Sequence, residues 1–457
     1  MNEETASEVC VVRRTTTVLV WATVFMWFGT LIAWVSGDFG VFPDTATYEV
    51  GQGFPISFVG DAWRAWPTPL LFSVTADYRT QSLIQAVLLG FSWTAILWVF
   101  LRRSQWKVAL CASVALVALA LTPLYLQWTL TILSEATTLS FVLLGLCSAQ
   151  EYVNRRGLEL RPTWLSATIG ATSLVAFALA AMTRLTLVIV LISIGATLVI
   201  FAVRVGQRAV AGVLAALLVV LVGYTWFLNT RIDEHWGVSR AATYYGYLTA
   251  SETDLQAVLA DPLLAYISER GPECLAGRRA SAGGATGPDP YQFRGELRRE
   301  CPNGVAWLEE SFQSEYAKFL ATHPAYATRF IIHYLPRVSD AGEYVGVTSV
   351  LPAFVGDIYS SSRDGLNEYR PIYLWLAIWL ASAMIATRRM KRNLTSSRQF
   401  VVPFVIAGSS VIALLATVLT LNSEVARIAS QATALLIAST IVTIAGLASK
   451  GERVGGK

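Results

Sequence analysis

The stretch PTWLSATIGATSLVAFALAAMTRLTLVIVLISIGATLVIFAV, Pro162–Val203, carries a single charged residue, Arg184. A helix that spans a bilayer needs about 20 apolar residues, so this stretch is too long for one span and long enough for two. We therefore predict a tight, outward-facing hairpin of two membrane-spanning helices with Arg184 at its turn. The hairpin indicates an all-α polytopic membrane protein.

The composition of the whole chain agrees with this interpretation. Of its 457 residues, 54% are hydrophobic and 14% are charged, whereas a soluble globular protein carries about 25% charged residues. These values argue against a disordered chain and against a soluble enzyme. The net charge of +4 is small and scattered along the chain, so we expect no nucleic-acid partner. The sequence contains no P-loop, CxxC or HExxH motif.

Charge-free runs of membrane-spanning length recur along the chain. They are Thr15–Gly37, Thr80–Leu101, Val108–Ser134, Pro162–Thr183, Leu185–Val203, Ala209–Thr230, Pro371–Thr387, Gln399–Ser423 and Ile428–Ser449. A further run, Ala136–Gln150, becomes a full span if Glu135 lies at its end. We predict about ten spans: a seven-helix membrane module (1–230) with a first outer loop (38–79), a large outer loop (231–370) and a three-helix membrane segment (371–457).

Basic residues set the expected orientation, because cytoplasmic loops of membrane proteins are enriched in Lys and Arg. With a cytoplasmic N-terminus, every inner segment carries such residues, among them the pairs Arg102-Arg103, Arg155-Arg156 and Arg388-Arg389. Arg also greatly outnumbers Lys, which is typical of GC-rich bacterial genomes. We expect a protein of the bacterial plasma membrane with both termini in the cytoplasm and its active site on the outer face.

The two long outer loops carry patterns of their own. In the first, Trp63, Trp66, Pro67 and Pro69 indicate a re-entrant or interfacial segment. These residues predict ordered structure in the first loop, outside the spans.

The large outer loop predicts helices separated by a linker. Ser251–Asp254 fits a capping box ahead of a helix over Leu255–Ile267, and Asn303 is expected to cap a helix over Gly304–Ala321. The Gly- and Pro-rich segment Ala280–Pro290 predicts a flexible linker between them.

Two of the five cysteines, Cys274 and Cys301, flank this linker, whereas the other three fall in the cytoplasmic tail or the spans. The outer side of a bacterial membrane is oxidising, and disulfides persist there. The sequence therefore predicts a Cys274–Cys301 disulfide; two unpaired thiols are the alternative.

Several charged residues fall at the outer ends of different spans, where a charge is costly unless it is paired or functional. They are Asp44, Glu135, Arg184, Glu424 and Arg427. A partly desolvated carboxylate has a raised pKa and suits general-base catalysis on a sugar hydroxyl. An arginine at the same depth suits the phosphate of a lipid-linked substrate. These groups together indicate glycosyl transfer from a polyprenyl phosphate.

With these residues identified, the chain resembles the GT-C superfamily of integral membrane glycosyltransferases, which use polyprenyl-phosphate sugars. The first span is followed by a long outer loop that begins with Asp44-x-x-x-Tyr48, and a second long outer loop follows the seventh span. The resemblance implies that Asp44 is the catalytic acidic residue, because members carry one just after the first span. It implies donor-site roles for Glu135 and Arg184.

This chain departs from the family pattern at two positions. Members have a charged cluster opening the last span, here Glu424 and Arg427, but this chain has Arg-Ile where Arg-Tyr is frequent. Many members have two adjacent acidic residues where this chain has only Asp44. A divalent cation, Mg or Mn, is therefore left open as a cofactor.

Other charged residues are weaker candidates for binding substrate. Asp61 and Arg64 are either acceptor contacts or interfacial anchors. Arg329, His333 and Arg337 occupy the polar side of the amphipathic segment Pro324–Leu335, where Arg329 and Arg337 suit phosphate and His333 suits a sugar. The alternative is a solvated helix face.

The main candidates also have structural interpretations. Asp44 would then cap an interfacial helix at Thr45, and Glu135 and Arg184 would neutralise each other. Glu424 and Arg427 are three residues apart and would form a surface pair on one helix face.

We therefore expect an inverting hexosyl- or pentosyltransferase that moves a sugar from a polyprenyl-phosphate donor to an envelope glycan, lipid or protein acceptor at the bilayer. An O-antigen-type polymerase or ligase is the enzymatic alternative. A lipid-linked glycan transporter or flippase is a second alternative, although transporters place functional charge near the bilayer midplane. A sensor or scaffold is a third.

Overall fold

The computed structural model describes residues 56–59, 64–101, 106–120, 122, 125, 134–156, 164–235, 240–249, 254–278, 290–339, 371–392, 398–420 and 425–448. Within these ranges the regular structure is helical and contains no strand. The all-α prediction is confirmed. The first expected span, Thr15–Gly37, lies outside the described residues.

Six helices of the described part are long and apolar enough to cross a membrane. These segments are Tyr78–Phe100, Leu185–Arg204, Arg208–Ile232, Pro371–Arg389, Phe400–Leu419 and Ala429–Ala448, and shorter apolar helices cover Lys107–Ala120 and Ala167–Thr183. The structure is thus that of a helical membrane protein, and the count of ten spans remains a prediction.

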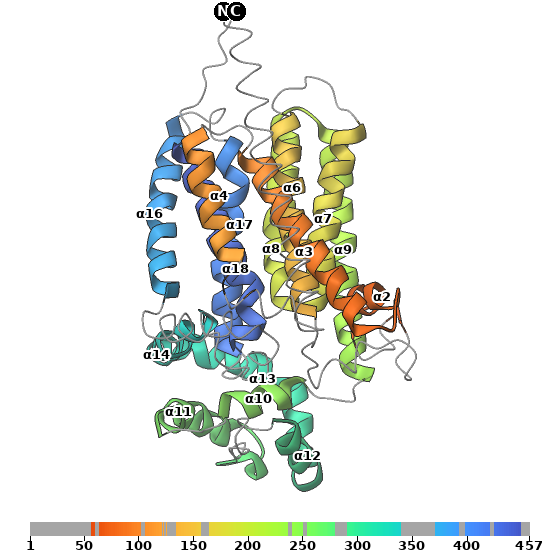
Figure 1. The fold of residues 1–457 in the computed structure, drawn as a ribbon. Helices are drawn as coiled ribbons and strands as arrows, with labels where there is room; N and C mark the ends of the chain where they lie inside the picture. The colour runs from red at the N-terminus through yellow and green to blue at the C-terminus, as the bar shows by residue number, and fades with distance from the viewer. Residues whose placement is uncertain are drawn as a thin grey trace, which may run out of the picture.

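Long helices lie side by side in a bundle, and shorter helices gather at its lower end (Figure 1). The bundle contains α3 (Tyr78–Leu101), α4 (Trp106–Ala120), α6 (Ser134–Arg156), α7 (Trp164–Thr183), α8 (Val188–Arg204), α9 (Arg208–His235), α16 (Pro371–Arg392), α17 (Arg398–Thr420) and α18 (Val425–Ala448). The shorter helices are α2 (Pro67–Phe72), α10 (Arg240–Thr249), α11 (Asp254–Arg270), α12 (Pro290–Glu300), α13 (Pro302–Thr322) and α14 (Pro324–Tyr334), with the 3-10 turns η3 (Glu273–Leu275) and η4 (Leu335–Ser339).

The hairpin around Arg184 is present in the structure. Helix α7 ends at Thr183, and the 3-10 turn η2 (Leu185–Leu187) leads directly into α8. Arg184 adopts an extended conformation, with φ −140° and ψ 95°, which interrupts the helical path and allows the chain to reverse.

Helix α6 is buried on most sides, although it is more polar than its neighbours. Its buried polar residues include Glu135, Thr138 and Gln150, and these explain why α6 is absent from the six apolar spans. It approaches α7 closely: the Ser173 hydroxyl donates to the Gly145 carbonyl at 2.8 Å, and a Cβ at Gly145 would lie 2.8 Å from the Phe177 ring. Small residues at such contacts allow close packing of helices in membranes.

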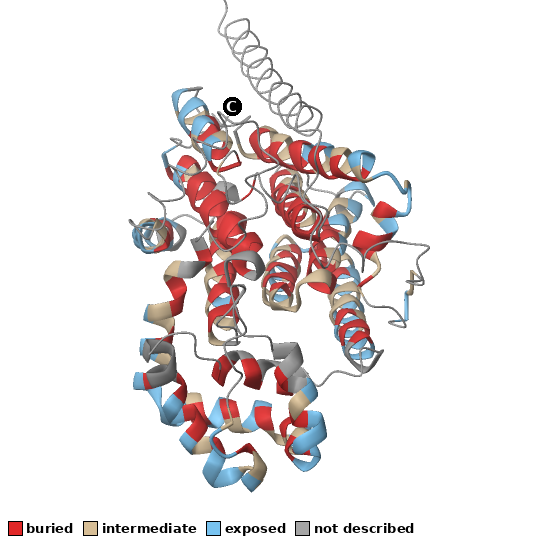
Figure 2. Cartoon of the chain, turned by 60° about the horizontal axis from the view of Figure 1, so that its bottom comes forward, coloured by how far each residue is buried: buried red, intermediate tan, exposed pale blue. Residues whose placement is uncertain are grey.

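Burial divides the bundle into central and peripheral helices (Figure 2). In the apolar window of α18, 83% of residues are buried, whereas in those of α9 and α16 only 17% are buried. The outward side chains of α9 include Val219 and Val220, which are 72% and 64% exposed. Exposed aliphatic side chains on a helix of this length suit contact with lipid.

The run Val108–Ser134 is described only in part. Its N-terminal part forms α4, which ends at Ala120 and is followed by a bend at Thr122. Most residues of the run beyond Thr122 lie outside the described residues, so the span expected there stays a prediction.

Helices α10 to α14 form an extramembrane layer that docks on the bundle ends. The hydroxyl of Tyr316 in α13 donates to the carbonyl of Leu419 near the end of α17 at 2.6 Å. The hydroxyl of Tyr373 in α16 donates to the carbonyl of Ile332 in α14 at 2.9 Å. These two bonds tie the layer to the membrane helices.

The extramembrane layer departs from the sequence predictions in its helix boundaries. Helix α13 begins at Pro302 with Cys301 as the N-cap residue, so Asn303 lies within the first turn and is not the cap. Proline is favoured at this first helical position. Helices α10 and α12 were not predicted, and α11 extends to Arg270. Residues 251–253 of the expected capping box and 280–289 of the expected linker lie outside the described residues.

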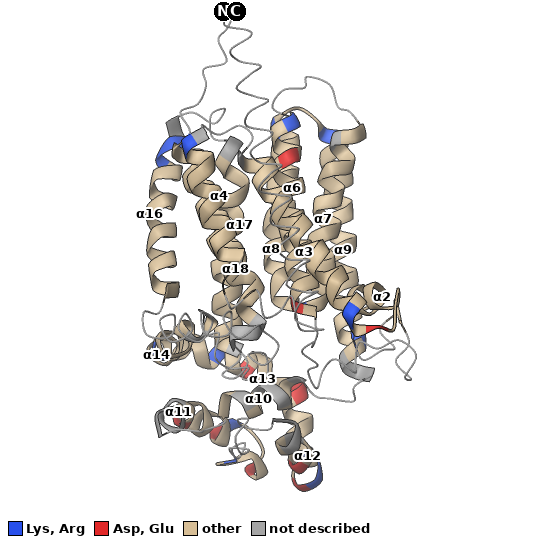
Figure 3. Cartoon of the chain, in the orientation of Figure 1, with Lys and Arg blue, Asp and Glu red and all other residues tan. Residues whose placement is uncertain are grey.

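Charged residues concentrate at the two ends of the bundle (Figure 3). The upper end carries Lys107, Arg155, Arg204, Arg208 and Arg388, each at or near the end of its helix. The extramembrane layer lies at the opposite end. The middle of the bundle is nearly free of charge, as expected of helices that cross hydrocarbon.

Candidate functional site

Glu135 and Arg184 form an ion pair at the end of the bundle next to the extramembrane layer. The Arg184 Nη2 atom donates to the Glu135 Oε1 atom. Glu135 lies in the first turn of α6, and Arg184 lies in the α7–α8 turn. The tight hairpin brings the guanidinium against the start of α6, which packs along α7.

The two side chains differ in burial. Glu135 is 1% exposed and Arg184 is 14% exposed, so the carboxylate is inside the protein and part of the guanidinium reaches the surface. A carboxylate in the first turn also has a favourable interaction with the helix dipole. A buried charge that loses its partner costs about 3–5 kcal/mol, which explains why this carboxylate is held against an arginine.

Neighbouring hydroxyl and amide groups fix the turn. Thr138 Oγ1 and Thr183 Oγ1 share a hydrogen bond of 2.6 Å that joins α6 to the end of α7. The amide of Asn229 in α9 donates to the Thr225 carbonyl at 2.9 Å and, at 3.5 Å, to the Met182 carbonyl. These contacts hold the backbone just before Arg184 against α6 and α9.

The guanidinium retains hydrogen-bonding capacity. Its Nε atom is buried and has no hydrogen-bond partner in the described part of the chain. Since arginine carries five N–H donors and the hydrogen bond to Glu135 uses one nitrogen, the group can hold a carboxylate and bind an anion at the same time. Phosphate is an anion that matches this donor geometry.

Most of the other predicted site residues are not brought together in the described part of the structure. Asp44, Tyr48, Asp61 and Glu424 lie outside the described residues. The backbones of Arg427 in α18 and Arg337 in η4 are described, but their side chains are not. The expected cluster around Asp44 therefore stays a prediction.

The remaining candidates lie in separate elements. Arg64 is partly buried just ahead of α2. Arg329 is exposed on α14, whose buried face is formed by Tyr326, Phe330 and Tyr334. His333 is half-buried, with its ring edge-on to the Tyr334 ring at a centroid distance of 4.7 Å. Arg329 thus lies on the polar face that the sequence predicted.

The sequence analysis missed a groove between α11 and α13. The groove has a volume of about 1030 Å³. Its lining residues are Pro262, Ala265, Tyr266, Glu269, Arg270, Trp307, Ser311, Glu315, Lys318, Thr322 and His323. Spacings of three and four residues place these side chains on one face of each helix. That periodicity was available in the sequence, but it did not show that the two faces oppose each other.

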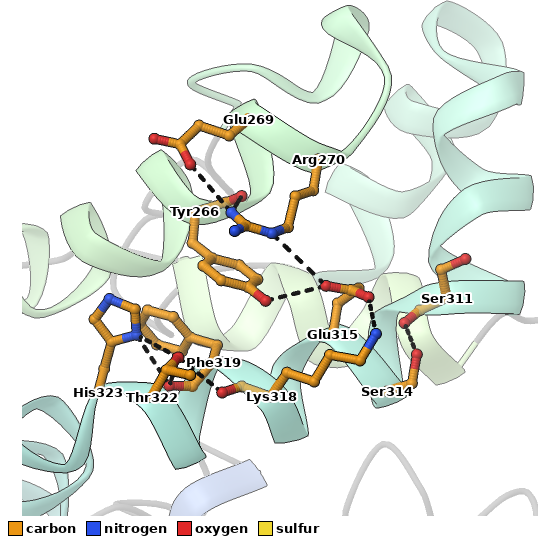
Figure 4. Close-up of polar contacts among 10 residues, drawn as sticks. All are labelled: Tyr266, Glu269, Arg270, Ser311, Ser314, Glu315, Lys318, Phe319, Thr322 and His323. Carbon is orange, nitrogen blue, oxygen red and sulfur yellow. Dashed lines mark hydrogen bonds and ion pairs between the residues drawn. The ribbon is translucent and has the colours of Figure 1, made fainter.

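Glu315 is the centre of the polar contacts in the groove (Figure 4). It accepts a hydrogen bond from the Tyr266 hydroxyl at 3.0 Å and one from the Lys318 ammonium at 2.6 Å, and the Arg270 guanidinium lies 4.0 Å away. The hydrogen bonds from Lys318 and Tyr266 lower the pKa of Glu315. Desolvation, followed by the bond to Glu315, raises the pKa of Tyr266.

The Cys274–Cys301 disulfide joins η3 to the N-cap of α13, with a Cα–Cα distance of 5.6 Å. It lies at one end of the groove, since it follows α11 and precedes α13. Gly304 packs against it: a Cβ at this position would overlap Cys301 Sγ and lie 2.8 Å from Leu275 Cδ2.

Among the described residues, no group of three or more His, Cys, Asp and Glu side chains is arranged to hold a metal ion. Comparisons with family models, with curated proteins and with solved structures found no match for this chain. The assignment of function therefore rests on the residues of the chain and their geometry.

Proposed function

We propose that this protein is an inverting membrane glycosyltransferase that moves a sugar from a polyprenyl-phosphate donor to an envelope acceptor on the outer face of a bacterial plasma membrane. The Glu135–Arg184 pair carries the proposal. It is a buried ion pair at the bundle end, and in this proposal the exposed part of its guanidinium meets the lipid phosphate at the membrane surface.

Two features of the structure support the outer location of this bundle end. The extramembrane layer on this side contains a disulfide, and disulfides persist in oxidising compartments. The basic ends of the helices lie on the opposite side (Figure 3), as the enrichment of Lys and Arg in cytoplasmic loops requires.

In the proposed reaction, Arg184 binds the donor phosphate and Glu135 holds the guanidinium in place. Asp44 takes the proton from an acceptor hydroxyl as its oxygen attacks the anomeric carbon. The new glycosidic bond forms opposite the bond to phosphate, which breaks and leaves a polyprenyl phosphate. One base is sufficient for such an inverting displacement, and Tyr48 orients either this base or the sugar.

The remaining candidates have supporting roles in the proposal. Arg427, Arg329 and Arg337 contribute positive charge toward the donor phosphate. Asp61, Arg64, His333 and Glu424 contact or orient the acceptor.

The double variant Glu135→Gln/Arg184→Met tests the role of Arg184 in phosphate binding. It removes both charges together, so no unpaired charge stays buried, and Met preserves much of the length of the arginine stem. Farnesyl phosphate is the probe, because it carries the donor's phosphate without requiring knowledge of the sugar. A charge-assisted hydrogen bond contributes about 1.5–3 kcal/mol, so we expect affinity to fall about 10–100-fold in calorimetry with purified full-length protein.

A second ion pair on the same helix provides the matched control. Glu151 and Arg155 pair at 2.8 Å at the other end of α6, and Glu151→Gln/Arg155→Met should leave binding unchanged. Farnesol should not bind at the Arg184 site, because it lacks the phosphate. Unchanged affinity for farnesyl phosphate in the Glu135/Arg184 variant would overturn the donor-site assignment and leave the pair a purely structural contact.

A further inference from the structure

We infer that the groove between α11 and α13 binds an uncharged glycan chain. This inference concerns binding outside the membrane bundle, and it does not require the transfer reaction proposed above. Four features of the groove point to this class of ligand: its shape, its balanced charge, its aromatic and hydroxyl side chains, and its attachment to the bundle.

The groove runs between two antiparallel helices. Gly271 at the end of α11 lies beside Trp307 near the start of α13, whereas Tyr266 reaches Glu315 and His323 farther along α13. The volume of about 1030 Å³ is at the upper limit of the range of about 300–1,000 Å³ for small-molecule sites. Its volume suits a chain of several sugar units better than a single one.

The charges of the lining balance one another. Two acidic residues, Glu269 and Glu315, face two basic residues, Arg270 and Lys318. Arg270 contacts both carboxylates, at 3.1 Å from Glu269 Oε2 and 4.0 Å from Glu315 Oε2. An anionic ligand would meet two carboxylates and a cationic ligand two cations, so an uncharged polar ligand is favoured.

The side chains supply the contacts that a sugar chain requires. Trp307 is partly buried and offers an aromatic surface on which the C–H face of a sugar ring can pack. Ser311 and Thr322 present hydroxyl groups, and the paired carboxylates and cations both accept and donate hydrogen bonds. The Tyr266 ring is less accessible, since the Arg270 guanidinium covers it at 3.9 Å from its centroid.

The groove is held firmly relative to the membrane bundle. The disulfide joins the segments at one end of its two helices, and Tyr316, next to Glu315 in α13, binds α17 through the Leu419 carbonyl. A preformed site loses little conformational entropy on binding. A glycan bound here would remain at the outer surface, within the layer that covers the bundle end.

Saturation-transfer NMR with the purified full-length protein in nanodiscs tests the inference. The probes are two neutral oligosaccharides, mannohexaose and arabinohexaose, and one anionic oligosaccharide, hexagalacturonate. We expect at least one neutral probe to bind and the anionic one not to bind. Trp307→Ala should weaken binding at least 10-fold, and Ala265→Trp, which fills the groove without removing a packed side chain, should do the same.

Three further variants complete the test. Trp164 is 79% exposed at the start of α7, at the opposite end of the bundle, and Trp164→Ala should keep full affinity. Glu269→Gln/Glu315→Gln leaves only cations in the groove and should admit hexagalacturonate. Glu135→Gln/Arg184→Met should keep oligosaccharide binding. This result would show that the groove binds glycan independently of the proposed donor site. The inference is overturned if neither neutral probe binds, if binding survives both groove variants, or if hexagalacturonate binds wild-type protein best.

Discussion

Glu135 shows at the residue scale how burial and an ion pair engage a carboxylate. Glu135 is 1% exposed and held by Arg184, so its charge is already engaged in an ion pair. A base that accepts a proton from an acceptor must have a free lone pair within reach of the substrate. Asp44, which follows the first expected span, therefore remains our proposed base, and Glu135 is assigned to positioning Arg184.

Replacement of Asp44 tests this assignment. Asp44→Asn keeps the size of the side chain and abolishes its basicity, and loss of a general base typically costs about 10²–10⁴-fold in rate. We expect the variant to bind farnesyl phosphate normally and to lose transfer by that factor, measured with a radiolabelled polyprenyl-phosphate sugar in isolated membranes. A variant that retains more than about a tenth of wild-type transfer would move the base to Asp61 or Glu135. It would also favour the polymerase or ligase alternative, which relies on arginines and a histidine of the large loop.

Gly304 lies where the packing beside the disulfide leaves no room for a side chain. A Cβ there would overlap Cys301 Sγ and press on Leu275, and overpacking of this kind costs about 1–3 kcal/mol. Gly304→Ala should therefore lower the melting temperature of the detergent-solubilised protein. Gly295→Ala is the matched control, because a Cβ at Gly295 in α12 would meet no atom within 4 Å. Alanine is favoured over glycine in a helix by up to about 1 kcal/mol, so the control should be neutral or stabilising.

At the scale of elements, helix boundaries were the part of the sequence prediction that failed most often. Proline accounts for one of these failures. Pro302 occupies the first turn of α13, so this helix begins before the Gly304 start that Asn303 was expected to cap. Helices α10 and α12 are short and lack a membrane-spanning run, so hydropathy did not reveal them. In contrast, the α7–α8 hairpin follows directly from two apolar runs separated by one arginine.

The disulfide contributes to stability at this scale by joining η3 to α13. It closes a loop with a sequence separation of 27 residues, for which chain entropy in the unfolded state predicts roughly 3 kcal/mol. Cys274→Ser should lower the melting temperature, and reduction followed by alkylation of native protein should add mass at the two cysteines of the segment 231–370. Cys111→Ser, at an exposed free cysteine of α4, should leave the melting temperature unchanged. Two alkylated thiols in this loop before reduction would contradict the disulfide.

At the scale of the whole molecule, the basic helix ends and the disulfide-bearing layer lie on opposite sides of the bundle. This arrangement predicts which side faces the cytoplasm. In a background that lacks Cys10, Cys111 and Cys147 but keeps the disulfide, a cysteine at Arg204 should be shielded from an impermeant thiol reagent added to intact cells, whereas one at Ser314 should be labelled. Both positions are exposed on the protein surface, so a difference in labelling reports the membrane side. Labelling at position 204 alone would invert the proposed orientation.

The sequence by itself determined that this protein is helical and embedded in a membrane, because a long charge-free run in lipid must satisfy its backbone hydrogen bonds within a helix. It also identified Arg184 at a turn, since no other charge interrupts that stretch. Only the tertiary structure decided what these residues contact. Arg184 and Glu135 are 49 residues apart in sequence, as are Tyr266 and Glu315. Contacts over such separations depend on how helices pack, which the apolar pattern of each helix does not specify.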